Sequence, residues 1–249
     1  MSYRITIEPS RHQFEVEPGN TLLRAALASG IHLPYGCRNG ACGACKGRVV
    51  SGQVDRGLHA EGALTDDEVA RGYALFCCAR PLSDLVIEAR EASAVRDVPV
   101  RTLPCRVQKM ARLAPDVMLL QLKLPARDRL QFLAGQYIDI LLKDGRRRSF
   151  SIANAPQADD CLELHVRRVP GGHFTCHVFE TMKERDILRF EGPHGDFFLR
   201  EDSVKPIILL AGGTGFAPIK ALVEHAAHQK TARPMTLYWG ARDRAGLYL

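Results

Sequence analysis

The alternation of apolar and polar residues predicts a hairpin and a helix at the start of the chain. Residues 3–7 and 13–17 each alternate between apolar and polar side chains and are separated by a short polar segment, which is typical of a β-hairpin. The pair Asn20 and Thr21 then offers an N-cap before an apolar helical face, and Gly30 is a typical residue just beyond a helix end.

Short apolar runs continue through the first part of the chain. Runs at 48–50, 73–76 and 85–88 predict further strands, so we expect residues 1–90 to form a small mixed sheet with one helix. Residues 91–99 show weak periodicity, which is typical of a linker.

From residue 100 to about 200 the apolar runs are short, closely spaced and separated by Gly, Pro and Asp turns. They occupy 117–123, 137–142, 149–153, 162–168 and 187–190. This spacing is typical of an antiparallel barrel.

The pattern changes again at Pro206. The uninterrupted apolar run 207–210 predicts a buried parallel strand, and a Gly-rich turn, a helical segment over 217–228 and a second strand from Met235 to Trp239 complete the start of a β-α-β unit. Because two strands and one helix do not bury both faces of a parallel sheet, we expect segment 206–249 to be weakly stabilised, as in a fragment or a shortened gene product.

Composition and charge exclude several classes of protein. The 249 residues are 46% hydrophobic and 25% charged, which is ordinary for a globular chain. The net charge of +6 is scattered, without the long basic runs of nucleic-acid-binding tails. No stretch approaches the ~18–20 apolar residues of a membrane span, and the N-terminus lacks the apolar core of a signal peptide. We therefore expect a cytoplasmic protein with no nucleic-acid partner and no membrane span.

The cysteines are unevenly distributed, and in a reducing compartment they need a role other than disulfide formation. Cys37, Cys42 and Cys45 have the spacing C-x4-C-x2-C, which together with one distant cysteine is that of plant-type [2Fe–2S] clusters. The glycines and alanines between them keep side chains away from a cluster and leave backbone N–H groups free to face its sulfurs.

The fourth thiolate comes from Cys77 or Cys78. Neighbours in an extended segment point to opposite faces, so only one of them is a ligand, and periodicity leaves the choice open. A zinc site usually has two C-x2-C pairs, whereas this sequence has one, and a thioredoxin-like motif needs a βαβ context that is absent here.

Two segments resemble plant-type ferredoxins. Residues 31–47 are similar to the cluster loop of that family, and residues 72–84 are similar to the segment that carries its fourth ligand. The resemblance implies a β-grasp ferredoxin domain and selects Cys77, leaving Cys78 as a packing residue. The implied ligands are Cys37, Cys42, Cys45 and Cys77.

The tetrapeptide Arg148-Ser149-Phe150-Ser151 resembles the R-x-Y-S motif of the ferredoxin–NADP reductase superfamily. The resemblance implies that Arg148 pairs with the FAD pyrophosphate and that Phe150 stacks on the isoalloxazine. It also implies that Ser151, the candidate catalytic residue, hydrogen-bonds near flavin N5, where the hydride arrives. Phe150 replaces the commoner tyrosine, which keeps the stacking and removes a phenol hydrogen bond.

Three further segments stand in the order of the same superfamily. Residues 132–137 resemble the strand before the flavin motif, residues 170–175 resemble the Gly-rich turn and helix start at the flavin pyrophosphate, and residues 192–197 resemble a turn that closes the barrel. The additional cofactor contacts expected in this region are Ser149, His165, Val166, Gly171, Gly172 and Thr175.

A Gly-rich turn lies between the apolar run 207–210 and the helical segment 217–228. A turn at the start of a helix brings a pyrophosphate to backbone N–H groups. The Gly-rich turn is not G-x-G-x-x-G but resembles the G-G-T-G-x-A-P turn of the same superfamily, with Pro218 near position N1 of the helix. Residues 237–242 resemble the next strand and its loop, and Arg242 leaves NADH and NADPH both open. The expected contacts are Gly212, Gly213, Thr214, Gly215, Pro218 and Arg242.

We therefore expect an α+β β-grasp ferredoxin domain, an antiparallel β-barrel FAD domain and a partial α/β nucleotide-binding domain. The expected boundaries are 1–92 for the ferredoxin domain, 93–102 for a linker, 103–203 for the FAD domain and 204–249 for the incomplete NAD(P) domain.

The resemblance implies an NAD(P)H-dependent reductase that passes electrons through FAD to a [2Fe–2S] cluster and on to a partner, which is a dehydratase or an oxygenase component. This domain order is shared by reductase components of bacterial mono- and dioxygenases and by CDP-6-deoxy-3,4-glucoseen reductase, and segments 78–85 and 148–154 favour the latter group. The alternative is a non-catalytic electron carrier or redox sensor whose short nucleotide domain does not bind its cofactor.

Overall fold

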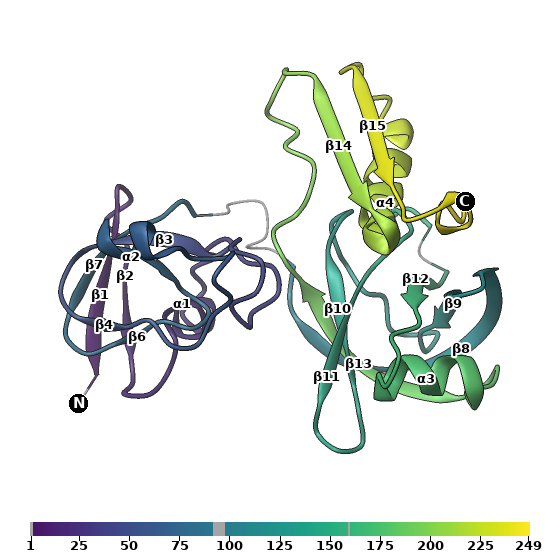
Figure 1. Cartoon of the computed structure of the whole chain (residues 1–249), viewed down its shortest axis with the longest axis horizontal. Coiled ribbons are helices and arrows are strands. Elements are labelled where there is room, and N and C mark those ends of the chain that lie inside the picture. The colour runs from purple at the N-terminus through teal and green to yellow at the C-terminus, as the bar shows by residue number, and fades with distance from the viewer. Residues whose placement is uncertain (1, 92–97, 159) are drawn as a thin grey trace. The chain divides into compact units, whose positions relative to one another are not determined.

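The computed structural model describes residues 2–91, 98–158 and 160–249. The chain divides into two compact units, Met1–Asp97 and Val98–Leu249, which are described separately below (Figure 1). Half of the predicted linker 93–102, namely residues 93–97, lies outside the described residues, and a strand already begins at Arg101. The four domain boundaries stay predictions.

The first unit is a five-stranded mixed sheet in the order β2-β1-β7-β3-β5. Strands β1 and β7 are parallel and the other ladders are antiparallel, as predicted for a mixed sheet. The strands are β1 Tyr3–Glu8, β2 Gln13–Val16, β3 Lys46–Ser51, β5 Tyr73–Leu75 and β7 Leu85–Glu88; a separate short pair is formed by β4 Val54–Asp55 and β6 Arg80–Pro81.

Helix α1 (Leu22–Ala28) begins and ends where the sequence predicts. The side chain of Thr21 accepts a hydrogen bond from the N–H of Arg24, and Gly30 follows the helix with φ of +73°. The expectation of a single helix was wrong, because Thr65 and Glu68 form a capping box that starts a second short helix, α2 (Asp66–Ala70).

The second unit contains a six-stranded sheet in the order β11-β10-β13-β8-β9-β12, and its ladders are antiparallel. The strands are β8 Arg101–Ala114, β9 Val117–Lys123, β10 Tyr137–Leu141, β11 Arg147–Ser151, β12 Leu162–Arg167 and β13 Ile187–His194. Helix α3 (His173–Glu180) follows β12 and packs its buried Phe174 and Val178 into the sheet core.

The predicted barrel is only partly closed, because among the described residues no continuous ladder joins the two ends of the sheet. The end strands β11 and β12 are joined by a single bridge between Ile152 and Leu164, and by a hydrogen bond of 2.7 Å from the N–H of Ala153 to the carbonyl of Glu163. The sheet is therefore barrel-like, with its closure made at the residues that follow β11.

The C-terminal part of the second unit is the predicted β-α-β start. Strand β14 (Ile207–Gly212) leads through a 3-10 turn, Gly213–Gly215, into helix α4 (Phe216–His228), and β15 (Met235–Gly240) pairs with β14 in parallel. Pro218 is the third residue of α4 and not the first, because the helix begins at Phe216.

One face of the β14–β15 pair is covered by α4 (Figure 1). Leu209 and Ala211 are buried on that face, whereas Ile208 and Leu210 on the other face are 74% and 78% exposed. Among the described residues, no helix has the length and apolar character to cross a membrane.

Candidate functional site

The four predicted ligand cysteines gather in the first unit as two pairs. The side chain of Cys37 hydrogen-bonds with that of Cys42, and the side chain of Cys45 hydrogen-bonds with that of Cys77. A [2Fe–2S] cluster takes four thiolates, two on each iron, so the pairing matches the donor set that the cluster requires.

Backbone N–H groups of the cysteine loop point at these sulfurs. The N–H of Ala41 lies 3.3 Å from Sγ of Cys37, that of Cys37 lies 3.4 Å from Sγ of Cys42, and that of Cys77 lies 3.5 Å from Sγ of Cys45. Such contacts stabilise thiolates and, in a holoprotein, the sulfurs of a cluster. The residues present therefore fit an iron–sulfur cluster.

The loop also depends on a glycine. Gly40 has φ of +80°, and a Cβ atom added there would lie 2.8 Å from Sγ of Cys78 and 3.1 Å from Cα of His59. A side chain at this position is excluded both by the backbone conformation and by the space.

The thiols differ in how readily they ionise. The hydrogen bond from Cys45 lowers the pKa of Cys77 to about 6 against the effect of burial, and the same contact raises the pKa of Cys45. Burial raises the pKa of Cys78 to about 12, and its Sγ lies 3.6 Å from that of Cys77. The lowered pKa favours the thiolate form of Cys77, which is the form that binds a metal.

Strand β11 carries two residues of the predicted flavin motif, Arg148 and Phe150, on one face. Arg148 and Phe150 lie opposite the buried Ile140 and Ile138 of β10, and the ring of Phe150 lies 5.4 Å from that of Phe174 between centroids. Directly opposed residues of an antiparallel pair share a face, so Arg148 and Phe150 point to the same side.

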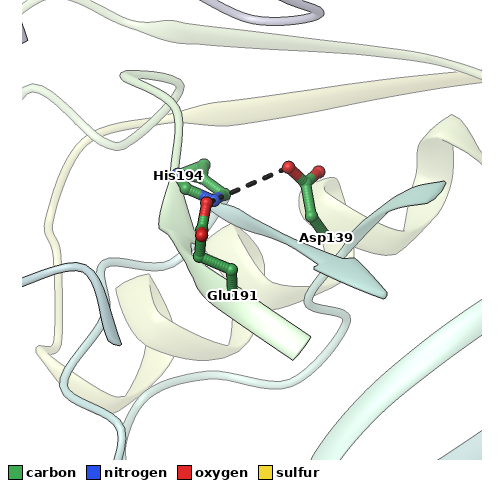
Figure 2. A group of neighbouring side chains, drawn as sticks. All are labelled: Asp139, Glu191 and His194. Carbon is green, nitrogen blue, oxygen red and sulfur yellow. Dashed lines mark ion pairs between the residues drawn. The ribbon is translucent and has the colours of Figure 1, made fainter. Parts of the chain in front are cut away.

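The other face of β11 is fixed by a polar cluster that the sequence analysis missed, formed by Asp139, Glu191 and His194 (Figure 2). Nε2 of His194 lies 3.7 Å from Oδ2 of Asp139 and 3.4 Å from Oε1 of Glu191. Ser149 donates to Oδ1 of Asp139 at 2.6 Å, and the guanidinium of Arg147 pairs with Glu191. The signal in the sequence was a charged residue inside the apolar strand 137–141.

The turn before α3 brings Gly171, Gly172 and Thr175 together. Gly171 has φ of +71°, Gly172 is the N-cap without a side-chain hydrogen bond, and the hydroxyl of Thr175 accepts from the N–H of Val169 at 3.1 Å. The hydroxyl thus stabilises the turn, and the backbone N–H groups at the helix start suit an anion.

The Gly-rich turn after β14 lies beside a cation that the sequence analysis also missed. The guanidinium of Arg167 lies 3.5 Å from the position that a Cβ of Gly213 would take. Its Nη1 is 3.4 Å from Oδ2 of Asp116, while its buried Nε and Nη2 have no hydrogen-bond partner among the described residues. Unsatisfied guanidinium donors beside a turn of this kind suit a phosphate.

Aromatic side chains also contact the Gly-rich turn after β14. Nε1 of Trp239 donates to the carbonyl of Gly213 at 2.9 Å, and its ring stacks on Phe216 with centroids 3.9 Å apart. Tyr248 meets both rings edge-on. Gly212, Thr214, Gly215 and Pro218 lie on the turn and the first turn of α4, whereas Arg242 is exposed after β15.

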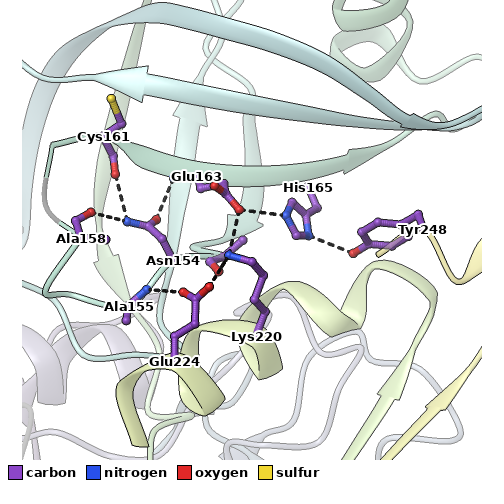
Figure 3. A network of polar contacts seen from close by, with 10 residues as sticks. Asn154, Ala155, Ala158, Cys161, Glu163, His165, Lys220, Glu224 and Tyr248 are labelled. Atoms are coloured by element: carbon purple, nitrogen blue, oxygen red, sulfur yellow. Dashed lines mark hydrogen bonds and ion pairs between the residues drawn. The ribbon is translucent and has the colours of Figure 1, made fainter. Parts of the chain in front are cut away.

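The remaining predicted residues lie inside the second unit. Val166 is part of the sheet core, and His165 is buried with Nδ1 2.9 Å from the hydroxyl of Tyr248 and Nε2 3.3 Å from Oε1 of Glu163 (Figure 3). Ser151 ends β11 opposite Tyr137 and is half-buried. The structure thus gathers the flavin motif and the Gly-rich turn in one unit.

Comparison with known proteins identifies three domains in the chain. Residues 5–82 match the 2Fe-2S iron-sulfur cluster binding domain, 104–199 match the oxidoreductase FAD-binding domain, and 209–249 match the oxidoreductase NAD-binding domain. The three cofactors are therefore a [2Fe–2S] cluster, FAD and a nicotinamide nucleotide.

The similar proteins are reductases. The chain is 42% identical over 240 residues to the CDP-6-deoxy-L-threo-D-glycero-4-hexulose-3-dehydrase reductase of Yersinia pestis, covering 96% of this chain and 72% of that protein. It is 40% identical over 251 residues to the terephthalate 1,2-dioxygenase reductase component 1 of Comamonas, covering all of this chain and 73% of that protein. The structure of the Amycolatopsis cytochrome P450 reductase GcoB matches with a TM-score of 0.76 and 38% identity, covering 99% of this chain and 74% of that one.

The domain matches and these relatives establish the same assignment. The chain belongs to the family of iron–sulfur flavoprotein reductases that transfer electrons from NAD(P)H through FAD to a [2Fe–2S] cluster.

Proposed function

We propose that this chain is the reductase component of a two-protein system and that its electron acceptor is a dehydratase acting on a nucleotide-linked deoxysugar. The 42% identity to the Yersinia dehydrase reductase over 96% of the chain supports this acceptor. The second candidate acceptor is an oxygenase component, which the 40% identity to the Comamonas dioxygenase reductase favours.

The cluster ligands that we propose are Cys37, Cys42, Cys45 and Cys77. The observation that carries this assignment is that Cys37 contacts Cys42 and that Cys45 contacts Cys77 and not Cys78, so that each pair suits one iron; Cys78 contacts Cys77 at 3.6 Å between sulfurs. Cys78, which is not among the contacts of Cys45, is a neighbour of Cys77 and not a ligand in this proposal.

For the flavin, we propose that Arg148 binds the pyrophosphate and that Phe150 packs on the ring system, with Ser151 at the reacting edge. Arg147 and Ser149 make their contacts on the opposite face of β11. Arg148 donates to the neighbouring carbonyl of Arg147, and Phe150 packs beside Phe174, so neither side chain is held by the polar cluster. Because its hydroxyl is engaged with Asp139, Ser149 positions the strand and is not a cofactor contact in this proposal.

For the nicotinamide nucleotide, we propose that the Gly-rich turn 212–215 and the guanidinium of Arg167 together bind the pyrophosphate. The turn supplies backbone N–H groups at the start of α4, and Arg167 supplies two buried donors that have no other partner among the described residues. When bound, the nicotinamide supplies a hydride to the flavin, and the flavin passes electrons singly to the cluster.

We further propose that the protein works in the cytoplasm, where its eight free thiols stay reduced. The partner assignment is tested by reconstitution. Purified protein and NADH are mixed anaerobically with a CDP-deoxyhexulose dehydratase or, separately, with an oxygenase component, and product formation is measured. Turnover with the dehydratase alone supports the proposal; turnover with the oxygenase alone moves the partner to the second class.

A further inference from the structure

Helix α4 contacts the flavin-binding sheet and the backbone after β11 through a polar cluster centred on the ammonium group of Lys220. Nζ of Lys220 lies 3.1 Å from Oε1 of Glu163 on β12 and 2.7 Å from Oε1 of Glu224 on α4, and it donates to the carbonyl of Ala153 at 3.2 Å (Figure 3). An ammonium has three donors, so these contacts use its full capacity.

Glu224 extends the same contact to the backbone beyond β11. Its Oε2 accepts from the N–H of Ala155 at 3.2 Å, while its Oε1 binds Lys220. Ala153 and Ala155 follow Ser151 closely along the chain. The helix that carries the Gly-rich turn is therefore held against the backbone that carries the proposed flavin motif.

The neighbouring residues support this contact. Glu163 also binds Nε2 of His165, and the side chain of Asn154 accepts from the N–H of Glu163 at 2.8 Å and donates to the carbonyls of Ala158 and Cys161. The side chains of Lys220 and Glu163 are 23% and 18% exposed. Partly buried ion pairs are screened less by solvent and salt than pairs at the surface, so this contact restrains the helix where it meets the sheet.

We propose that Lys220 is a positioning residue for the reduction of the flavin by NAD(P)H, because it holds the Gly-rich turn and α4 at a fixed separation from the end of β11. The inference rests on the proposed cofactor sites. Lys220 lies on the first turns of α4, directly after the turn, so a displacement of the helix moves the bound nucleotide relative to the flavin. A misplacement of about 1 Å between reacting groups costs about a hundredfold in rate.

The test compares Lys220→Met with wild-type holoprotein by anaerobic stopped-flow absorbance of the flavin at increasing NADH. We expect the limiting rate to fall about tenfold or more while the half-saturating NADH concentration changes less than about threefold. Lys220→Arg is expected to restore most of the rate. Lys205→Met, an exposed lysine outside the contacts, is the control.

A second readout does not depend on activity. Trp239 is the single tryptophan of the chain, and its hydrogen bond to Gly213 makes its fluorescence report on the turn. Acrylamide quenching of Trp239 is expected to increase in Lys220→Met and to stay unchanged in Lys205→Met, with equal FAD and iron contents. If Lys220→Met does not fold, Glu224→Gln is measured instead, and a smaller change in the same direction is expected.

The inference is overturned if Lys220→Met changes neither the limiting rate nor the quenching of Trp239. It is also overturned if Lys220→Met lowers only the affinity for NADH. Wild-type protein that neither NADH nor NADPH reduces contradicts the proposed function instead, and the positioning role is then decided by the quenching of Trp239 in the variant.

Discussion

The hydroxyl of Ser149 donates a hydrogen bond of 2.6 Å to Oδ1 of the buried Asp139. This contact fixes the position of the residue between Arg148 and Phe150, so that the two proposed flavin contacts face the other way. Ser149 therefore contacts the sheet, whereas its neighbours Arg148 and Phe150 are the proposed contacts of the flavin.

Replacing Arg148 by alanine is expected to weaken FAD binding without loss of the cluster. A charged hydrogen bond to phosphate is worth about 1.5–3 kcal/mol, so the dissociation constant should rise about ten- to hundredfold. FAD retention on gel filtration and the iron content measure the two effects. Arg146→Ala is the matched control, because Arg146 pairs locally with Asp144. Loss of iron in Arg148→Ala contradicts the assignment.

Cys77→Ser should abolish binding of the cluster, whereas Cys78→Ser should leave the cluster bound. Cys77 forms the hydrogen-bonded pair with Cys45, and Cys78 is a neighbour of Cys77 outside this pair. The visible absorbance of the cluster and acid-labile sulfide are measured in both variants. The reverse result assigns the fourth ligand to Cys78.

The sequence predicted those parts of the fold whose pattern is local. The run 137–142 became β10, and the segment 217–228 became α4, because apolar spacing decides which face of an element is buried. Strand β8 was not predicted, since Pro104 and outward-facing charged residues interrupt the alternation of Leu103, Cys105 and Val107.

In the candidate site, too, local motifs were predicted and contacts between distant residues were not. The cysteine spacing and the tetrapeptide at 148–151 are contiguous and were found in the sequence. The contacts of Asp139 with His194 and of Glu163 with Lys220 join residues on separate strands and helices, which only the folded chain brings together. Arg167 was missed because its role depends on Gly213 lying beside it.

The ion pair of Glu163 predicts a pH dependence of stability. The hydrogen bond from His165 and the charge of Lys220 lower the pKa of Glu163 to about 2 from its ordinary value of 4.5. A lowered carboxyl pKa contributes stability above the unfolded value near pH 4.5, and this contribution is lost as the pH falls toward 2. The shift corresponds to at most about 3–4 kcal/mol, and solvent screening of this partly exposed group reduces it.

Urea unfolding followed by Trp239 fluorescence measures this contribution at pH 7 and at pH 3. Glu163→Gln is expected to be less stable than wild type at pH 7, and the difference should shrink at pH 3. Asp202→Asn, an exposed acid of the same unit, should show no such change. A difference that is the same at both pH values contradicts the role of Glu163.

The exposed apolar face of β14 and β15 predicts low local stability. Ile208 and Leu210 are largely exposed, so β14 gains burial from α4 on one face only. We expect the amides of β14 and β15 to exchange hydrogen faster than those of β9 and β10 in a native-state experiment. Protection equal to that of the FAD-binding sheet would show that the expectation is wrong.

The central claim is that one chain carries electrons from a nicotinamide through FAD to a [2Fe–2S] cluster. Anaerobic titration of the purified holoprotein with NADH and with NADPH, followed by visible absorbance, tests it directly. The account predicts that the flavin and cluster bands both bleach with one of the two nucleotides. A protein whose bands bleach with dithionite and stay unchanged with both nucleotides would contradict it.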